Sequence, residues 1–99
     1  MTSELSIGFA HSAVADLEEV QAWYRRLDAP EVGARVIAGI IAQIERLSEF
    51  PESGRVVPEF DVPSLREIID PPFRIVYRLQ AERVLIVRIR RSERLMDLT

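Results

Sequence analysis

The stretch LREIIDPPFRIVYRLQAERVLIVRIRRSERL, residues 65–95, decides the fold, because apolar and charged side chains alternate along it at the two-residue period of β-strands. Residues 73–79 and 83–91 both follow this pattern, and the three residues between them have the length of a hairpin connection. The dipeptide Pro71–Pro72 separates residues 73–79 from an earlier strand at residues 65–69. These segments, with a further predicted strand at residues 55–60, indicate an antiparallel sheet in the C-terminal part of the chain.

The same alternation predicts two different faces for the hairpin. Phe73 and every second residue after it form a core face, and Leu85, Val87 and Ile89 are expected to share that face. The opposite face is expected to be open, and it carries arginines around a strip of aliphatic side chains: Arg74, Arg78, Arg88 and Arg90 around Val76, Val84 and Ile86. Exposed aliphatic side chains rimmed by arginine are typical of a binding interface.

The N-terminal half predicts one strand and two helices. Residues 5–9 alternate as a strand does, and Ser12 is the expected N-cap of the first helix, whose apolar stripe extends to Leu27. Trp23 lies beside that stripe, where it either packs in the helical hairpin or binds a partner. Pro30 starts a second helix, in which Gly33 and Gly39 predict a close approach of the two helices.

The predicted fold class is therefore α+β, in the order β-α-α-β-β-β. An N-terminal strand is followed by an antiparallel α-helical hairpin, because the join between the helices is only two or three residues long. A three- to four-stranded antiparallel sheet follows, and residues 1–99 are expected to form a single domain.

Composition narrows the possible functions. The net charge of −3 argues against a simple electrostatic nucleic-acid binder. The charge is unevenly distributed, however: residues 1–54 hold four arginines and nine acidic residues, whereas residues 55–99 hold nine arginines and seven acidic residues. All 13 basic residues are arginine and cysteine is absent, so thiolate metal sites are excluded, and no metal or cofactor is predicted. The chain opens on no signal-peptide pattern and has no run long enough for a membrane span, so a cytoplasmic location is expected.

Five segments occur in an order that resembles the RelE/ParE toxin superfamily of bacterial type II toxin–antitoxin modules. They are HSAVADLEEVQAWY at residues 11–24, FPESGRVVPEF at 50–60, LREII at 65–69, FRIVYRL at 73–79 and VLIVRIRRSERL at 84–95. The resemblance implies a small plasmid-stabilisation toxin neutralised by an antitoxin encoded beside it. The acidic, partly disordered C-terminal segment of such an antitoxin wraps the toxin and covers its sheet and helical hairpin.

The superfamily has two branches with different targets, and the resemblance alone leaves both open. RelE-like members cut messenger RNA in the ribosomal A site, whereas ParE-like members inhibit DNA gyrase. Arg74 matches the phosphate-stabilising arginine of the nucleases, which Arg66, Arg88 and Arg90 would support, and Glu59 matches the acidic general base of some of them. Nucleases place a histidine or tyrosine just after the last strand to protonate the leaving oxygen.

This chain has Arg91, Ser92, Glu93 and Arg94 at that position, and arginine rarely donates a proton. Its single histidine, His11, is expected to end the first strand, and Tyr24 and Tyr77 fall on predicted core faces. The interpretation is therefore a ParE-like toxin that inhibits gyrase by binding, and it leans away from an enzyme. A RelE-like ribonuclease that uses Glu59 and Arg74, or a non-toxic antitoxin-binding relative, are the alternatives.

The predicted residues for binding the antitoxin or the target come from the open face and the basic tail. The cognate antitoxin is the expected partner, in a toxin–antitoxin hetero-oligomer, and DNA gyrase is the expected target. The predicted binding residues are Arg66, Arg74, Val76, Arg78, Val84, Ile86, Arg88, Arg90, Arg91 and Arg94.

Overall fold

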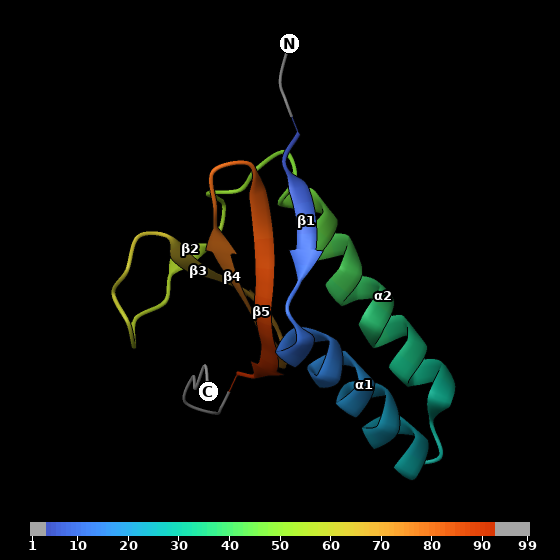
Figure 1. Cartoon of the computed structure of the whole chain (residues 1–99). Coiled ribbons are helices and arrows are strands. Elements are labelled where there is room, and N and C mark those ends of the chain that lie inside the picture. Colours follow the sequence, from blue (N-terminus) through green and yellow to red (C-terminus); the bar gives the residue numbers. More distant parts are fainter. Residues whose placement is uncertain (1–3, 93–99) are drawn as a thin grey trace.

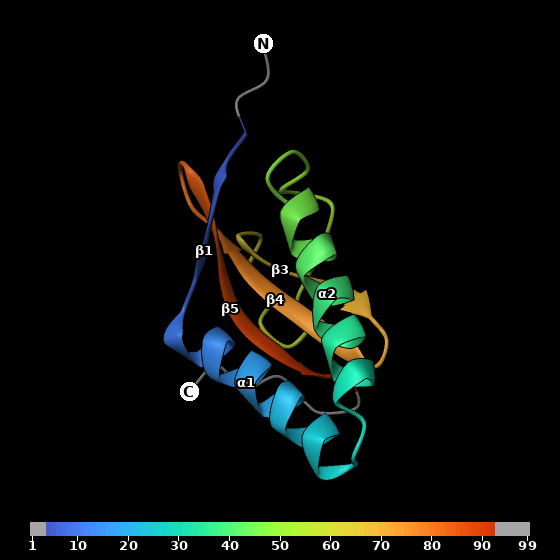
Figure 2. The ribbon, with the colours of Figure 1, turned by 90° about the vertical axis from the view of Figure 1, so that its right-hand side faces the viewer.

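Two helices lie side by side on one face of a twisted sheet in the computed structural model of the chain, which describes residues 4–92 (Figures 1 and 2). The connection between the second and third strands lies on the opposite side of the sheet. The elements in chain order are β1 (Ser6–Phe9), α1 (His11–Arg26), α2 (Pro30–Arg46), β2 (Arg55–Val56), β3 (Leu65–Asp70), β4 (Phe73–Leu79) and β5 (Arg83–Arg91). The predicted α+β fold and its helical hairpin are confirmed.

The N-terminal strand completes the sheet, which has five strands in the order β1-β5-β4-β3-β2. The strands from β2 to β5 pair in antiparallel fashion as predicted, but β1 pairs in parallel with β5, from Ser6 opposite Arg83 to Phe9 opposite Ile86. The sheet is therefore mixed. A parallel neighbour requires a long crossover, and here the whole chain from α1 to β4 provides it.

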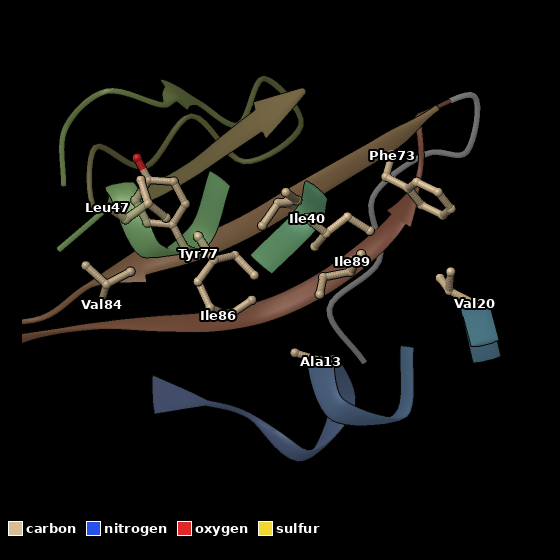
Figure 3. Close-up of a cluster of buried hydrophobic side chains, with 11 residues drawn as sticks. Ala13, Val20, Ile40, Leu47, Phe73, Tyr77, Val84, Ile86 and Ile89 are labelled. Carbon is tan, nitrogen blue, oxygen red and sulfur yellow. The ribbon is translucent and has the colours of Figure 1, made fainter. Parts of the chain in front are cut away.

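The main core lies between the helices and β4 and β5 (Figure 3). Ile40, Ile44 and Leu47, from α2 and the residue after it, meet Ile75 and Tyr77 of β4 in this layer. The remaining buried members are Ala13, Val20, Phe73, Val84, Ile86 and Ile89. A fully buried Ile or Leu side chain contributes about 1.5–3 kcal/mol, so this layer holds the hairpin to the sheet.

The predicted faces of β5 are wrong for its first half because the strand contains a β-bulge. Tyr77 pairs with Ile86 and Val76 pairs with Arg88, so Val87 is an extra residue in β5. Val84 and Ile86 therefore lie on the core face, fully buried. The extra residue moves every earlier residue of β5 to the other face of the sheet. A strict two-residue alternation in the sequence does not reveal such an insertion.

Strand β4 is buried on both faces, which the alternation did not predict. On the face away from the helices, Val76 packs against Val57 and Leu65, with Val87 beside them. Val57 belongs to the connection between β2 and β3, and its carbonyl accepts hydrogen bonds from the amides of Phe60 and Asp61. That turn begins at Pro58, so the predicted strand at residues 55–60 is limited to Arg55–Val56.

The start of α1 also differs from the prediction. His11 is the first residue of the helix, and Ala10 is its N-cap without a side-chain hydrogen bond. The hydroxyl of Ser12 does not cap the helix but donates to the carbonyl of Val87, at 2.7 Å. This hydrogen bond joins the first turn of α1 to the edge of β5.

The two predicted glycine contacts have different outcomes. A Cβ atom at Gly33 would lie 2.8 Å from the Cβ of Tyr24, so a close helix approach is confirmed there. A Cβ atom at Gly39 would have Asp70 Oδ2, at 3.9 Å, as its nearest neighbour, so the expected close helix contact is absent. The cost of glycine at position 39 has no compensating contact.

We expect Gly33→Ala and Gly39→Ala to change stability in opposite directions. Gly33→Ala should lower the free energy of unfolding by about 1–3 kcal/mol, because the Cβ of Tyr24 cannot rotate away. Gly39→Ala should raise it by about 0.5–1 kcal/mol, because alanine is the better helix former. Urea unfolding of both variants tests this, and equal changes at the two sites would contradict it.

Candidate functional site

The face of the sheet that points away from the helices, which we call the outer face, carries the predicted arginines of β4 and β5. In the register of these strands, Arg78 lies opposite Leu85 and Arg74 lies opposite Arg90, and directly opposed residues share a face. Within residues 4–92, neither Arg78 nor Arg90 forms a side-chain hydrogen bond or an ion pair. Their charges therefore remain available to a partner.

Arg74 lies at the centre of a buried ion cluster on the outer face. Its two terminal nitrogens donate to the two carboxylate oxygens of Glu59, both at 2.8 Å, and its Nε donates to Glu67 at 2.7 Å. Arg74 is only 6% exposed and Glu67 only 1%. Arg55 completes the cluster by donating to the second oxygen of Glu67 at 2.7 Å. The hydrogen bonds with Glu59 raise the pKa of the Arg74 guanidinium above its already high ordinary value.

The structure places Glu59 and Arg74, the two residues that the sequence analysis named for a nuclease, in direct contact. The turn after β2 positions Glu59, and the alternation of β4 turns Arg74 toward it. In this contact the charges of the Arg74 guanidinium and the Glu59 carboxylate compensate each other. A phosphate would have to displace the Glu59 carboxylate from the forked side of the guanidinium, where the two form a bidentate pair.

Two further predicted arginines, Arg66 and Arg91, have contacts within the described chain. Arg66 donates to the carbonyls of Pro63 and Gly54, both at 3.0 Å, and so ties down the segments on either side of β2. The guanidinium of Arg91 lies 5.9 Å from the centre of the Phe73 ring. Arg94 lies outside the described residues.

The aliphatic strip predicted for this face is not exposed. Val84 and Ile86 belong to the core on the other side of the sheet, and Val76 is covered by the β2–β3 connection. All three are fully buried, so the prediction that they form an exposed strip is wrong. The aliphatic side chain that lies beside Arg78 on the outer face is Leu85.

Arg88 is bound to α1 through Asp16. Its Nε and one terminal nitrogen donate to the two Asp16 oxygens, at 2.9 and 3.0 Å. The same carboxylate accepts the backbone amide of Ile89 at 2.8 Å. Asp16 therefore joins α1 to the edge of β5 just beyond the end of β1. Arg88 and Asp16 are 72 residues apart in the sequence, and the alternation of side chains gave no signal that they pair.

Tyr77 is a structural residue of the core. Its hydroxyl donates to the carbonyl of Pro51 at 2.8 Å and accepts the amide of Gly54 at 2.9 Å. Burial raises the pKa of this hydroxyl above its ordinary value of 10.0. The prediction that Tyr77 faces the core is confirmed, and both of its hydrogen-bonding roles are filled by the backbone.

We expect the Tyr77 hydroxyl to give the fold a pH dependence in the alkaline range. Because its pKa is raised in the folded state, its contribution is complete below pH 10.0 and is lost as pH rises through the folded-state value. Tyr77→Phe should lower the free energy of unfolding by about 1–3 kcal/mol at pH 7, since Gly54 and Pro51 lose a buried partner, and should weaken the alkaline decline. Urea unfolding between pH 7 and 11 measures both effects, with Tyr24→Phe as the control. An identical decline in the Tyr77→Phe protein would contradict the assignment.

A groove of about 550 Å³ separates α1 from the ends of β4 and β5. Trp23, whose role the sequence left open, lies in it and is 46% exposed. The guanidinium of Arg26 lies 5.8 Å from the centre of its ring. The lining residues are Asp16, Glu19, Val20 and Trp23 of α1, Phe73 of β4, and Ile89, Arg90 and Arg91 of β5. Trp23 is thus a groove residue, and the sequence gave no means of placing it in the same groove as Phe73.

Two further features limit the chemistry of the described part of the chain. Residues 4–92 contain no cluster of three or more histidine, aspartate or glutamate side chains arranged to hold a metal ion. Neither α1 nor α2 is long and apolar enough to cross a membrane.

Solved structures with the same fold define the class of protein. A chain of "Chromosomal ParDE TA system from P. aeruginosa" superposes with a TM-score of 0.77 at 27% identity, over 91% of this chain and 98% of that one. A chain of the toxin–antitoxin complex RelBE2 from Mycobacterium tuberculosis has a TM-score of 0.60 at 19% identity, over 89% and 98%, which shows the fold alone. The architecture is that of the RelE/ParE superfamily.

The sequence then assigns the branch. Residues 7–96 match the family described as the ParE toxin of the type II toxin–antitoxin system parDE. A curated relative from Sinorhizobium fredii (strain NBRC 101917 / NGR234), named "Putative toxin Y4kP", is 35% identical over 72 residues, 71% of each chain. The chain belongs to the ParE toxin family of type II toxin–antitoxin systems, and the predicted ParE-like character is confirmed.

Proposed function

We propose that this ParE-family toxin acts by binding, that its target is DNA gyrase, and that an antitoxin with an acidic, partly disordered C-terminal segment neutralises it. The observation that carries the proposal is the state of Arg74. The fork that would stabilise a phosphate in a nuclease is occupied by Glu59, and its Nε is bound to a fully buried Glu67. A group held in this way serves the fold rather than a reaction.

The proton donor that a nuclease needs is also missing from the expected position. The four residues from Arg91 to Arg94 include no histidine or tyrosine. The hydroxyl of Tyr77 is buried and bonded to the backbone on both sides, and His11 lies at the start of α1. General acid–base catalysis of RNA cleavage requires a titratable group that reaches the leaving oxygen, and these residues supply none there.

An antitoxin partner is supported by the comparisons and by charge. The two structural neighbours come from toxin–antitoxin systems, and the family is defined by such a pairing. On the outer face, Arg78 and Arg90 retain uncompensated positive charge within the described residues. An acidic segment would be attracted to this face and would form charge-assisted hydrogen bonds there.

A supercoiling assay tests the proposed target. Folded toxin is added to gyrase and relaxed plasmid, and a parallel tube receives the antitoxin encoded beside it. We expect inhibited supercoiling or trapped cleaved DNA, reversed by the antitoxin, and a DNA-damage response when the toxin is expressed in cells. Heat-unfolded toxin is the control. Normal supercoiling with folded toxin, together with messenger RNA cleavage on ribosomes, would overturn the proposal in favour of a nuclease.

A further inference from the structure

The outer face of the sheet carries, beside the β4–β5 hairpin, two arginines without an acid partner among the described residues. We propose that Arg78 and Arg83 form a contact site for the phosphate backbone of double-stranded DNA, on the part of the sheet where β1, β5 and β4 lie side by side (Figure 1). This inference rests on the proposed gyrase target and adds to it a direct contact with the DNA that gyrase holds.

The register of three strands brings the two arginines together. Leu85 of β5 lies between Gly8 of β1 on one side and Arg78 of β4 on the other. Arg83 comes two residues before Leu85 and therefore shares its face, as a diagonal neighbour of Arg78. Diagonal neighbours of this kind are about 7–8 Å apart, so both guanidinium groups reach the same stretch of a bound polymer.

Gly8 gives Arg83 the room to lie across β1. A Cβ atom at this glycine would lie 3.1 Å from Arg83 Nη1 and 3.7 Å from Leu85 Cδ1, so both side chains cover its bare backbone. The Nε of Arg83 donates to the side-chain oxygen of Gln80 at 2.6 Å, which orients the guanidinium. Its terminal nitrogens have no acid partner within residues 4–92, and the residue is exposed. The strands thus hold a cation against the sheet, where an anion can approach it from solvent.

The strands of the outer face leave an excess of positive charge. Among the described strand residues that the register places on this face, Glu67 is the single acid, and it already holds Arg74 and Arg55. Arg90, further along the same face, also has no ion pair within residues 4–92. A polyanion is therefore attracted to this face, although the net charge of the whole chain is −3.

The chemistry of the site favours a nucleic acid over a segment of protein. A protein partner is anchored by large apolar side chains in pockets, whereas the apolar side chain here, Leu85, is half-buried between two arginines. Arginine presents a planar fork of N–H donors that matches phosphate oxygens, and such contacts position a protein on DNA without reading its sequence. A polymer is favoured over a single phosphate, because each phosphate that is neutralised on DNA also releases condensed counterions.

The salt dependence of DNA binding tests the site. The full-length toxin is titrated into a short fluorescein-labelled DNA duplex, and anisotropy is measured between about 50 and 200 mM salt. The logarithm of the binding constant should fall with the logarithm of salt concentration with a slope of about −2, because each neutralised phosphate contributes about −0.9. Arg78→Gln and Arg83→Gln should each reduce this slope by about one and weaken binding about threefold or more at low salt. A slope near zero, or wild-type slopes in both variants, overturns the proposal.

Two matched variants separate the position of the charge from its amount. Arg35→Gln removes the same charge from the exposed side of α2 and should leave the slope unchanged. Gly8→Ala keeps every charge but places a methyl group where Arg83 lies, so it should weaken DNA binding about twofold or more. Urea unfolding should show an intact fold, because the side chain that must move is flexible at that end. Equal slopes for Arg35→Gln and Arg83→Gln, or wild-type binding by folded Gly8→Ala, would contradict the assignment.

Competing anions show whether DNA is the ligand of this site. Unlabelled DNA should displace the labelled duplex more effectively than an RNA duplex, polyglutamate or inorganic phosphate, each added at constant ionic strength. Stronger displacement by RNA or polyglutamate, or full displacement by millimolar inorganic phosphate, would assign the two arginines to another anion and overturn the proposal.

The supercoiling assay distinguishes this inference from the proposed target. Inhibition of gyrase that is lost in the folded double variant Arg78→Gln/Arg83→Gln supports both. Inhibition by that double variant at the wild-type concentration would overturn this inference and leave the target in place. DNA binding with the expected slope, but without any effect on gyrase, would overturn the target and leave this inference in place.

Discussion

Arg74→Ala is expected to lower the free energy of unfolding by about 3–5 kcal/mol, the cost of breaking a buried salt bridge by removing one partner. The variant leaves the carboxylate of Glu67, whose side chain is fully buried, without its closest cation, and it removes two hydrogen bonds to Glu59 in the turn after β2. The value should fall near 3 kcal/mol, because Arg55 still donates to Glu67 from the partly exposed side.

Urea unfolding followed by circular dichroism measures this loss, and Arg78→Ala is the matched control. Arg78 lies on the same strand and the same face, but it has no ion pair within the described residues, so its removal should cost less than about 0.5 kcal/mol. The double variant Arg74→Met/Glu67→Gln removes both buried charges and should be more stable than Arg74→Ala. Arg74→Ala with the stability of Arg78→Ala would show that the cluster does not hold the fold.

This result bears on how toxicity assays are interpreted. The nuclease hypothesis expects Arg74→Ala to abolish toxicity while the fold remains intact. The structure gives a different reason for the same loss, since a native protein has a total stability of only about 5–15 kcal/mol. Loss of toxicity in this variant therefore distinguishes a catalytic from a structural role only when unfolding is measured alongside it.

The fold was predictable from the sequence because its signals are local. The two-residue alternation of β3, β4 and β5 and the apolar stripes of the helices determine which segments are strands and helices, and a short join produces a helical hairpin. The parallel pairing of β1 with β5 was not predictable, because nothing in the residues of Ser6–Phe9 specifies a partner 77 residues away. The bulge at Val87 was hidden for the same reason, since it depends on the register with β4.

The site was predictable only in part. Resemblance to a family named Glu59 and Arg74 together, and the structure places them in contact. The burial of Arg74 and its bond to the buried Glu67 arise only in the folded chain, so the sequence did not show them. The groove joins Trp23 of α1 to Ile89 of β5, elements at opposite ends of the chain. No periodicity within α1 or β5 indicates that these residues lie in one groove. The position of Trp23 beside the apolar stripe of α1 was the single signal that the sequence offered.

Asp16→Ala is expected to lower the free energy of unfolding by about 3 kcal/mol and to loosen α1 from the sheet. β1 stops pairing at Ile86, and beyond that point side chains of α1 take the place of a neighbouring strand. Removing the carboxylate takes from Arg88, which is only 12% exposed, its two hydrogen bonds to Asp16, and leaves the Ile89 amide without that acceptor. Each loss costs about 1–3 kcal/mol, and the partly exposed position keeps their sum moderate.

The control on the same helix is Glu19→Ala, which removes an ion pair with Arg26 whose side chains are 57% and 71% exposed and should cost less than about 1 kcal/mol. Hydrogen exchange at the Ile89 amide gives a local measure, and we expect faster exchange in Asp16→Ala than in Asp16→Asn, which keeps an acceptor oxygen. Unchanged exchange at the Ile89 amide would contradict this prediction, and would mean that apolar contacts alone hold α1 to β5.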